Sequence, residues 1–394
     1  MKRRSFFRTG LAGVAGFSIF NRTAFAGKGT LVDNDITYRI LGRTGLKLPV
    51  VSFGVMRSDN SALVKAAHEA GMKMFDTAHT YMNGRNEEIL GDYFSSVPRE
   101  SFIIETKVKP AGVDQRTGLP SRETTAEDFL EKFDLSLKRL KMDYVDILYM
   151  HSVDSVEMVR HKEIVNAMLE LKQKGKVRFI GISTHKNEPL VINTMAEDGI
   201  WDVVLTSYNY RQTYINDLNS ALDKAVAAGM GVVAMKTMAG GWLDKERTKP
   251  VNSMAALKWV ISNPNVCTTI PGITTFDQLT LDLKVMSDPS LTESEKTDLL
   301  ADASCPGLYC NACSNCASGC PNNLPIPELM RAYMYAYGYR NLSMASELLT
   351  ETGVTSDPCS GCGTCTASCV KGFNLKEKIT DVSRLVDVPS DLLT

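Results

Sequence analysis

Eight cysteines near the C-terminus repeat one spacing twice, CxxCxxCxxxC. The first copy consists of Cys310, Cys313, Cys316 and Cys320, and the second of Cys359, Cys362, Cys365 and Cys369. Three thiolates at steps of three residues suit one iron–sulfur cluster, and in two-cluster ferredoxins the fourth cysteine of each run binds the other cluster. The spacing therefore predicts two 4Fe-4S clusters, one on Cys310, Cys313, Cys316 and Cys369, the other on Cys359, Cys362, Cys365 and Cys320.

Two alternatives to iron–sulfur remain open from the sequence. Disulfide frameworks belong to small exported chains that cannot build a core, whereas a chain of 394 residues can. Structural zinc sites usually pair two ligands at CxxC and place the other pair at a distance, whereas here a third cysteine follows at the same step. Of the other cysteines, Cys267 is expected to be a buried core thiol, and Cys305 lies close enough to be an outer neighbour of the clusters.

A second set of reactive side chains lies where apolar runs end. Asp76, Lys107, His151 and Ser183 occupy such ends, and Tyr81 follows Asp76 by five residues. A lysine can pair with an aspartate at a neighbouring strand end, and an ammonium near a tyrosine would lower the pKa of its phenol. Tyr81 then becomes a proton donor, with His151 bonded to the same substrate oxygen. Each residue alone could simply end a strand, but together they suit carbonyl reduction, where the oxygen must be protonated after hydride reaches carbon.

The elements that would position these residues alternate between short apolar runs and amphipathic segments from residue 48 to 287. The runs read LPVVSFGV, KMFDTA, FIIETKV, YVDILYMH, VRFIGIS, WDVVLTSYN, GVVAMK and CTTIPG. About eight strands close a (β/α)8 TIM barrel, in which chemistry collects at the carboxyl ends of the strands. An open doubly wound sheet is the alternative, but it would begin with a GxGxxG turn that this sequence lacks.

Helix signals agree with the barrel and extend into the tail. Thr125 can cap the segment that ends near Lys141, and Gly175 and Gly229 stop two later segments. Residues 326–351 are predicted to be helical, which makes the cysteine-rich domain mainly α-helical and ferredoxin-like, with Pro325 and Pro327 at the entry to its first helix. Four tyrosines alternate there, for which packing in a small domain is favoured over a cluster shield or a partner surface: Tyr333, Tyr335, Tyr337 and Tyr339.

The N-terminus predicts where the protein works. Arg3 and Arg4 precede a Phe pair, a mild Gly/Ala-rich stretch follows, and Ala24-Phe25-Ala26 ends it. This pattern is typical of a twin-arginine export signal over residues 1–26, a route for proteins that fold before export; an ordinary secretory signal or a chance basic start is the alternative. We therefore expect a periplasmic or otherwise extracytoplasmic protein with no transmembrane span after signal removal. A net charge of −1, with no basic block outside the predicted signal, argues against nucleic acid as a partner.

Much of residues 37–285 resembles the aldo-keto reductases. The resemblance rests on ITYRILGRTGLKLPVVSFG (37 to 54), FDTAHTYMNGRNEEILG (75 to 91), ETK at Lys107, DYVDILYMH to His151, GKVRFIGIST (175 to 184) and ALKWVISNPNVCTTIPG (256 to 272). It implies an N-terminal hairpin that closes the barrel bottom, NADP(H) bound without a Rossmann fold, and Asp76, Tyr81, Lys107 and His151 as the catalytic tetrad. With the tail, the chain is similar to the group that carries a C-terminal ferredoxin-type domain.

The sequence departs from that family at the cofactor site. The resemblance implies cofactor contacts at Ser183, Thr184, Lys236 and Gly272, but Ser183-Thr184 replaces the usual Ser-Asn. Leu205 stands where a Gln is usual, and Met235 where a tyrosine usually stacks on the nicotinamide. Residues 273–282 carry no Arg or Lys for an adenosine 2′-phosphate. NADP(H) is therefore a doubtful cofactor.

These observations predict a signal peptide (1–26), an aldo-keto reductase barrel (27–300) and a dicluster domain (301–394). The favoured function is an exported oxidoreductase that interconverts a small carbonyl compound and its alcohol, or a polyol, with Tyr81 as general acid. The alternative is an electron-transfer or substrate-binding protein whose clusters serve a redox partner protein and whose nicotinamide site is degenerate. A scaffold with an inactive barrel is a third hypothesis.

Overall fold

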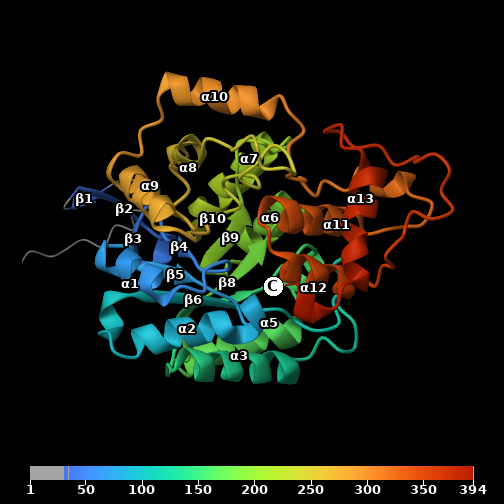
Figure 1. Cartoon of the computed structure of the whole chain (residues 1–394). Coiled ribbons are helices and arrows are strands. Elements are labelled where there is room, and N and C mark those ends of the chain that lie inside the picture. Colours follow the sequence, from blue (N-terminus) through green and yellow to red (C-terminus); the bar gives the residue numbers. More distant parts are fainter. Residues whose placement is uncertain (1–30, 34, 394) are drawn as a thin grey trace, which may run out of the picture.

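The computed structural model describes residues 31–33 and 35–393 and shows a barrel with a tail domain packed beside it (Figure 1). The predicted export signal, including Arg3, Arg4, Ala24 and Ala26, lies outside the described residues. None of the helices in the described ranges combines the length and apolar character that a membrane crossing requires.

Eight parallel strands form one sheet in sequence order, β4 to β11. Their bounds are β4 (Phe53–Gly54), β5 (Met74–Asp76), β6 (Ile103–Val108), β7 (Val145–Met150), β8 (Val177–Thr184), β9 (Val203–Ser207), β10 (Gly231–Met235) and β11 (Thr268–Thr269). The sheet closes because Ser52 N donates to Thr269 O at 2.8 Å and Gly54 N donates to Pro271 O at 3.0 Å. The (β/α)8 prediction is confirmed, and the open-sheet alternative is excluded by this closure.

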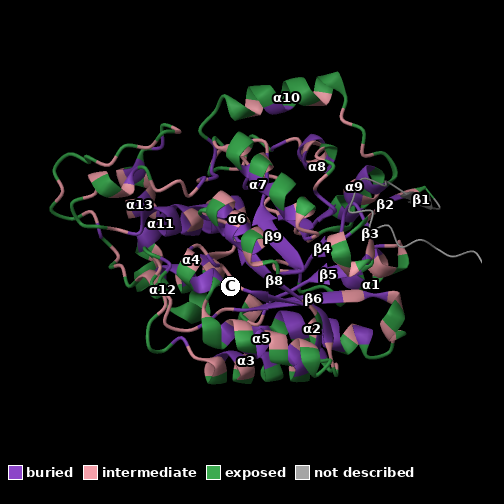
Figure 2. Ribbon diagram, turned by 180° about the vertical axis from the view of Figure 1, so that it is seen from behind, coloured by how far each residue is buried: buried purple, intermediate pink, exposed green. Residues whose placement is uncertain are grey.

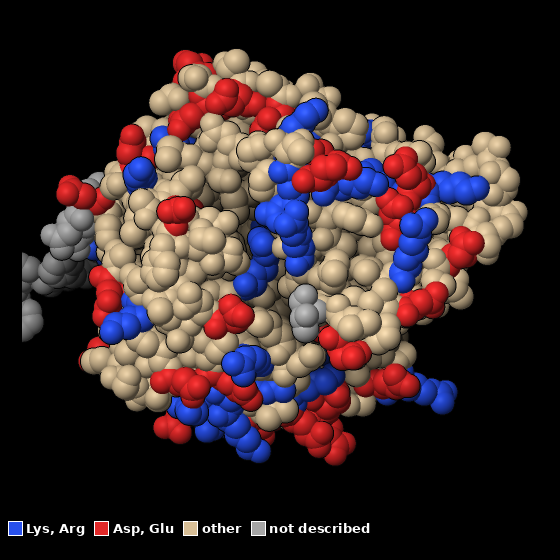
Figure 3. All heavy atoms as spheres, in the orientation of Figure 1, with Lys and Arg blue, Asp and Glu red and all other residues tan. Residues whose placement is uncertain are grey.

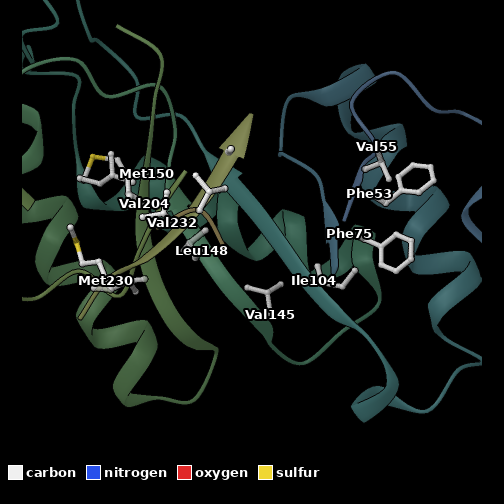
Figure 4. Packing of buried hydrophobic residues seen from close by; sticks show 14 of the residues in the cluster. Phe53, Val55, Phe75, Ile104, Val145, Leu148, Met150, Val204, Met230 and Val232 are labelled. Atoms are coloured by element: carbon white, nitrogen blue, oxygen red, sulfur yellow. The ribbon is translucent and has the colours of Figure 1, made fainter. Parts of the chain in front are cut away.

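The strands read as apolar runs because both of their faces are buried. Figure 4 shows Phe53, Phe75 and Ile104 among the side chains packed around the strands. Inside the barrel, residues from several strands and the N-terminal hairpin form a second cluster that includes Leu48, Leu205 and the thiol-bearing Cys267, which is 4% exposed. The expectation that Cys267 is a core thiol is therefore confirmed.

Helices surround the barrel and turn their exposed faces outward (Figure 2). They are α1 (Ser61–Glu69), α2 (Arg85–Phe94), α3 (Ala126–Leu140), α4 (Val156–Val159), α5 (Lys162–Gln173), α6 (Glu188–Asp198), α7 (Ile215–Ala227), α8 (Ser253–Ser262) and α9 (Phe276–Ser287). Thr125 caps α3 by accepting a hydrogen bond from Asp128 N. Gly175 and Gly229, just beyond α5 and α7, adopt the left-handed conformation that ends a helix. The sequence predicted these three boundary residues correctly.

A small antiparallel sheet precedes the barrel, made of β1 (Leu31–Asp33), β2 (Ile36–Ile40) and β3 (Lys47–Pro49). Arg39 on β2 donates hydrogen bonds to the carbonyls of Ile261 and Asn263, at the end of α8. Gly42 packs so tightly on Gly231, the first residue of β10, that a Cβ would clash. The hairpin therefore lies at the amino ends of the strands, opposite the predicted reactive residues.

The tail follows α10 (Glu293–Ala303), a helix that spans the domain boundary predicted at residue 300. Its helices are α11 (Ile326–Tyr333), a π-turn (Met334–Gly338), α12 (Leu342–Thr352) and α13 (Leu375–Ser383), which agrees with the mainly helical prediction. Pro325 caps α11 and Pro327 lies in its first turn, as expected. The tail docks on the loop after β9, where Tyr214 Oη donates to Asn311 O at 2.7 Å and Lys371 Nζ donates to Arg211 O at 3.2 Å.

Candidate active site and cysteine cavities

Lys107 and Asp76 form a buried ion pair at the carboxyl ends of β6 and β5. Their side chains are 1% and 4% exposed. Lys107 Nζ also donates to Thr77 O at 2.7 Å and to Tyr81 Oη at 3.5 Å. The lysine is thus held in place on one side by a carboxylate and on another by a backbone carbonyl. Its remaining contact is the phenol that sequence reasoning proposed as the proton donor.

Tyr81 begins a tight turn (Tyr81–Gly84) after β5 in which Met82 and Asn83 have left-handed backbone angles. Strained non-glycine residues of this kind are costly and often accompany functional sites. We expected Lys107 to lower the pKa of Tyr81, but burial first, and then the charge of Asp76, raises that pKa well above 10. Lys107 is already paired with Asp76, so its charge does not dominate. Tyr81 is therefore a neutral phenol, the form that can donate a proton.

His151 faces Tyr81 directly after β7. The two rings are perpendicular, with centroids 6.0 Å apart. His151 Nδ1 is buried without a hydrogen-bond partner in the described structure. Burial and the nearby cation Lys107 lower the pKa of His151 well below 6.5, so the ring is neutral. The structure thus brings together Asp76, Tyr81, Lys107 and His151, all four residues of the predicted tetrad.

Glu105 is a buried neighbour of this site that sequence reasoning missed. It lies two residues before Lys107 on β6, so both point to the same face, and it accepts a hydrogen bond from Tyr149 Oη at 2.8 Å. Burial and the charge of Asp76 raise the pKa of Glu105 well above 4.5, which keeps it protonated. The sequence did mark this residue, because an acidic side chain in the middle of the apolar run FIIETKV indicates a buried carboxyl group.

A cavity of about 1010 Å³ opens above the tetrad, between the barrel and the tail. Asp76, Tyr81 and His151 line it from the barrel, and Arg331 and Tyr335 line it from the tail. Figure 3 shows Lys and Arg side chains gathered beside a hollow on this face. The tail therefore forms one wall of the candidate active site, which the sequence did not predict. The π-turn that carries Tyr335 is a local irregularity often found at functional sites.

Only two of the four residues predicted to contact a cofactor line this cavity, Lys236 and Gly272. Ser183 is buried, and its hydroxyl accepts a hydrogen bond from Ser152 N at 2.9 Å. Thr184 is buried as well and donates to Lys186 O at 3.0 Å. Neither side chain is among those that line the cavity, because both are used in hydrogen bonds within the loops after β7 and β8.

The loop that the resemblance would place at an adenosine phosphate lines this cavity, together with cations that the sequence did not predict. Thr274, Thr275 and Gln278 line it without a positive charge, as residues 273–282 predicted. Two cations come instead from other loops, Arg57 after β4 and Arg247 after β10. Arg57 also donates to Tyr339 O of the tail at 2.9 Å. Burial, and in addition the positive charge of Arg331, lowers the pKa of Lys236 to about 7.

The cysteines surround two small cavities in the tail, and each cavity mixes the two runs. Cys310, Cys313 and Cys316 line the first cysteine cavity together with Cys369. Cys359, Cys362 and Cys365 line the second together with Cys320. This grouping is the one that the ferredoxin crossover rule predicts. Ile326, the first residue of α11, lines both cavities.

The geometry around the cysteines fits a cage-shaped cluster. All ten cysteines are free thiols rather than disulfides. In the described ranges, no three His, Cys, Asp or Glu side chains lie close enough together to share one metal ion. Four thiols spread around a cavity suit a multi-iron cluster, whose irons each take one thiolate. Cys305 is exposed and outside both sets of lining residues, so its expected role as a cluster neighbour gains no support.

Comparisons with known proteins match both parts of the chain. Residues 52–255 match the aldo/keto reductase family, and residues 309–375 match the 4Fe-4S dicluster domain. L-galactose dehydrogenase from Arabidopsis thaliana is 34% identical over 231 residues, covering 54% of this chain and 68% of that protein. L-glyceraldehyde 3-phosphate reductase from Escherichia coli is 30% identical over 226 residues, covering 52% of this chain and 62% of that protein.

Among solved structures, the aldo-keto reductase AKR11C1 from Bacillus halodurans superposes with a TM-score of 0.56 and 22% identity. The match covers 68% of this chain and 96% of that one. At this identity the likeness concerns the fold alone, and it agrees with the closed barrel described above.

Proposed function

The chain belongs to the aldo/keto reductase family and carries a 4Fe-4S dicluster domain, and from this premise we propose that it interconverts a small carbonyl compound and its alcohol. The observation that carries the proposal is the buried ammonium of Lys107 between Asp76 and Tyr81, with His151 facing the phenol. The names of the two relatives, a galactose dehydrogenase and a glyceraldehyde phosphate reductase, support a sugar-like or polyol substrate.

In the proposed reaction, Tyr81 is the general acid. When hydride adds to the carbonyl carbon, the C=O π electrons move to oxygen, and the phenol O–H donates its proton to that oxygen. The Lys107 ammonium stabilises the resulting phenolate, while Asp76 holds the ammonium in place. The neutral His151 ring can hydrogen-bond the carbonyl oxygen and fix its direction. The reverse sequence oxidises the alcohol.

The proposed hydride source is a nicotinamide dinucleotide. The cavity is large enough for a nicotinamide dinucleotide, and the cations Arg57 and Arg247 could pair with its phosphates. Gly272 and Lys236 line the same cavity. When bound, such a cofactor would supply the hydride. Met235, rather than an aromatic ring, is the side chain available at the nicotinamide end. NADP(H) is therefore retained as a cofactor to be tested.

We assign one 4Fe-4S cluster to each cysteine cavity, with the four lining cysteines as ligands. Support comes from the mixed grouping of the two runs and from the family match over residues 309–375. A second candidate function follows from the second cavity, whose Cys365 is solvent-exposed. A cluster there could exchange electrons with a redox partner protein. A midpoint potential outside the range of any one-electron carrier would exclude this role.

The sequence pattern at Arg3 and Arg4 supports export of the folded, cluster-loaded protein. Fractionation of cells that express the complete chain tests this location. Replacement of both arginines by lysine should leave the protein in the cytoplasm.

The proposed chemistry is tested on anaerobically purified, cluster-loaded protein. Mass spectrometry of the denatured sample shows whether a nucleotide is bound, and carbonyl-dependent oxidation of NADPH or NADH measures turnover. We expect turnover with small hydroxyaldehydes that Tyr81→Phe lowers by roughly 10²–10⁴-fold. A protein that neither contains nor binds a nucleotide would shift support to the electron-transfer candidate. Unchanged turnover in Tyr81→Phe would remove the proposed mechanism.

A further inference from the structure

The cavity above the tetrad holds more positive than negative side chains. Its lining includes six cations and three carboxylates: Arg57, Lys109, Arg139, Lys236, Arg247 and Arg331, against Asp76, Glu347 and Glu351. Asp76 is neutralised by Lys107, and Glu351 by Lys109 at 2.5 Å. Arg139 and Arg331 pair with carboxylates outside the lining, Glu87 and Glu328. Arg57, Lys236 and Arg247 form no ion pair with any described residue, so the cavity keeps an excess of positive charge, and such a field attracts anions.

Lys236 is one of the cations that line this cavity. It follows β10 directly, and its backbone is held at φ +56°, a strained angle for a lysine. Its ammonium makes no ion pair and no hydrogen bond with any residue of the described chain. Its ammonium lies over the ring of Tyr335, whose centroid is 6.0 Å away. A partly buried, unpaired ammonium is costly unless a ligand supplies the missing charge.

Arg331 comes from the tail and reaches the same region. One of its nitrogens pairs with Glu328 at 2.7 Å, and another donates to His185 Nδ1 at 2.8 Å. Burial, followed by the charges of Lys236 and Arg331, lowers the pKa of His185 well below 6.5. The same two cations also contribute to the lowered pKa of His151, after burial and Lys107. Both cations are therefore close to the histidine side of the cavity.

We infer that this corner binds an anionic group of the substrate, a carboxylate or phosphate held between Lys236 of the barrel and Arg331 of the tail. The inference rests on the proposed function, in which the carbonyl end of the same molecule lies at Tyr81 and His151. It also gives the iron–sulfur domain a role in substrate binding. Arg331 lies on α11, and that helix begins at Ile326, which lines both cysteine cavities.

Binding is measured by isothermal titration calorimetry on cluster-loaded protein that carries Tyr81→Phe, so that no turnover interferes. The probes are two matched pairs, glyceraldehyde 3-phosphate with glyceraldehyde, and glyoxylate with glycolaldehyde. We expect at least one anion to bind about tenfold or more tightly than its neutral partner, because a hydrogen bond to a charged group is stronger than one between neutral groups. The pair that shows the preference identifies phosphate or carboxylate as the group.

Lys236→Met and Arg331→Met should each remove most of that preference and leave the affinity for the neutral partner unchanged. Lys224→Met, at an exposed lysine on α7, is the matched control and should behave like the parent protein. Arg331→Lys should retain part of the preference, and iron content confirms that each tail variant still holds its clusters. Equal binding of charged and neutral probes, or a preference that survives Lys236→Met, would overturn the inference.

The same data separate this inference from the proposed function. Suppose that the protein with Tyr81 reduces no carbonyl but still shows an anion preference that depends on Lys236 and Arg331. That result would support the anion-binding site and contradict the proposed reaction. Turnover of carbonyls without any anion preference would do the reverse.

Discussion

The barrel site and the cysteine cavities reach their geometry by opposite means. In the barrel, Asp76 and Lys107 lie on adjacent hydrogen-bonded strands, and both side chains are almost fully buried. In the tail, the second cysteine run lies in residues 353–374, which contain no helix or strand. Cys365 is exposed there, and the backbone contacts are short turns such as Cys362 N to Cys359 O. The barrel therefore orders its site through its own core, whereas the cysteine loops depend on what they bind.

Because of this difference, we expect substitutions in the barrel site and in the cysteine loops to have separate effects. A change at the barrel site should alter chemistry and leave the clusters intact. A change at a cysteine should alter the tail and leave the barrel folded.

The largest expected effect is that of Tyr81→Phe on turnover. Removal of the phenol hydroxyl removes the proton donor, so we expect kcat to fall by roughly 10²–10⁴-fold. Iron content and the visible absorbance of the clusters should not change. The measurement is steady-state turnover beside iron analysis. If the variant also lost iron, the two regions would be coupled more tightly than their separate cores indicate.

Loss of one cluster is the next largest effect, and Cys369→Ala is expected to cause it. Cys369 belongs to the second run but lines the first cysteine cavity, so this variant should lose about half of the iron. The cysteines that become open to alkylation should be those of the first run. Cys320→Ala is the matched control and should expose the second run. Exposure of the cysteines in the opposite order would contradict the crossed grouping.

A smaller effect is expected for Glu105→Gln. Glutamine keeps a hydrogen-bond acceptor and a donor, as a protonated glutamate has, but it cannot gain or lose a proton with pH. Burial beside Asp76 raises the pKa of Glu105 in the folded protein. The folded chain then binds a proton that the unfolded chain releases above the ordinary glutamate pKa of about 4.3. Wild-type stability should therefore fall, relative to the variant, as pH rises from there toward the folded pKa.

Urea unfolding followed by tryptophan fluorescence from pH 5 to 8 measures this difference. The difference in unfolding free energy between wild type and Glu105→Gln should change by no more than about 1.4 kcal/mol per pH unit, the value for one bound proton. Parallel curves for wild type and Glu105→Gln would show that Glu105 does not hold the extra proton.

The smallest expected effect is that of Lys245→Ala on stability, because this change removes a surface ion pair between the barrel and the tail. Lys245 of the barrel pairs with Asp381 on α13 at 3.1 Å, and both side chains are partly exposed. Exposed ion pairs contribute about 0–1 kcal/mol, so Lys245→Ala should change the unfolding free energy by no more than that. A larger loss would mean that this ion pair, rather than the hydrogen bonds in the loop after β9, holds the tail in place.

The sequence predicted the barrel because strands buried on both faces appear as short continuous apolar runs, separated here by amphipathic helical segments. It also predicted which residues lie at strand ends, since parallel strands place their carboxyl ends on one side. Thus Asp76, Tyr81, Lys107 and His151 were identified from spacing and resemblance, and the structure brings them together. The ferredoxin rule for the fourth cysteine likewise anticipated the mixed sets around the two cysteine cavities.

Only the tertiary structure decided which distant segments meet at the site. Arg57 and Arg247 come from two separate loops and Arg331 from helix α11, and no local pattern marks them as neighbours. The raised pKa of Tyr81 was also hidden, because it depends on how deeply the folded chain buries the phenol. Local spacing sets secondary structure and strand-end positions. The packing of the tail against the barrel sets the charge and shape of the cavity, and that packing depends on contacts between residues far apart in the chain.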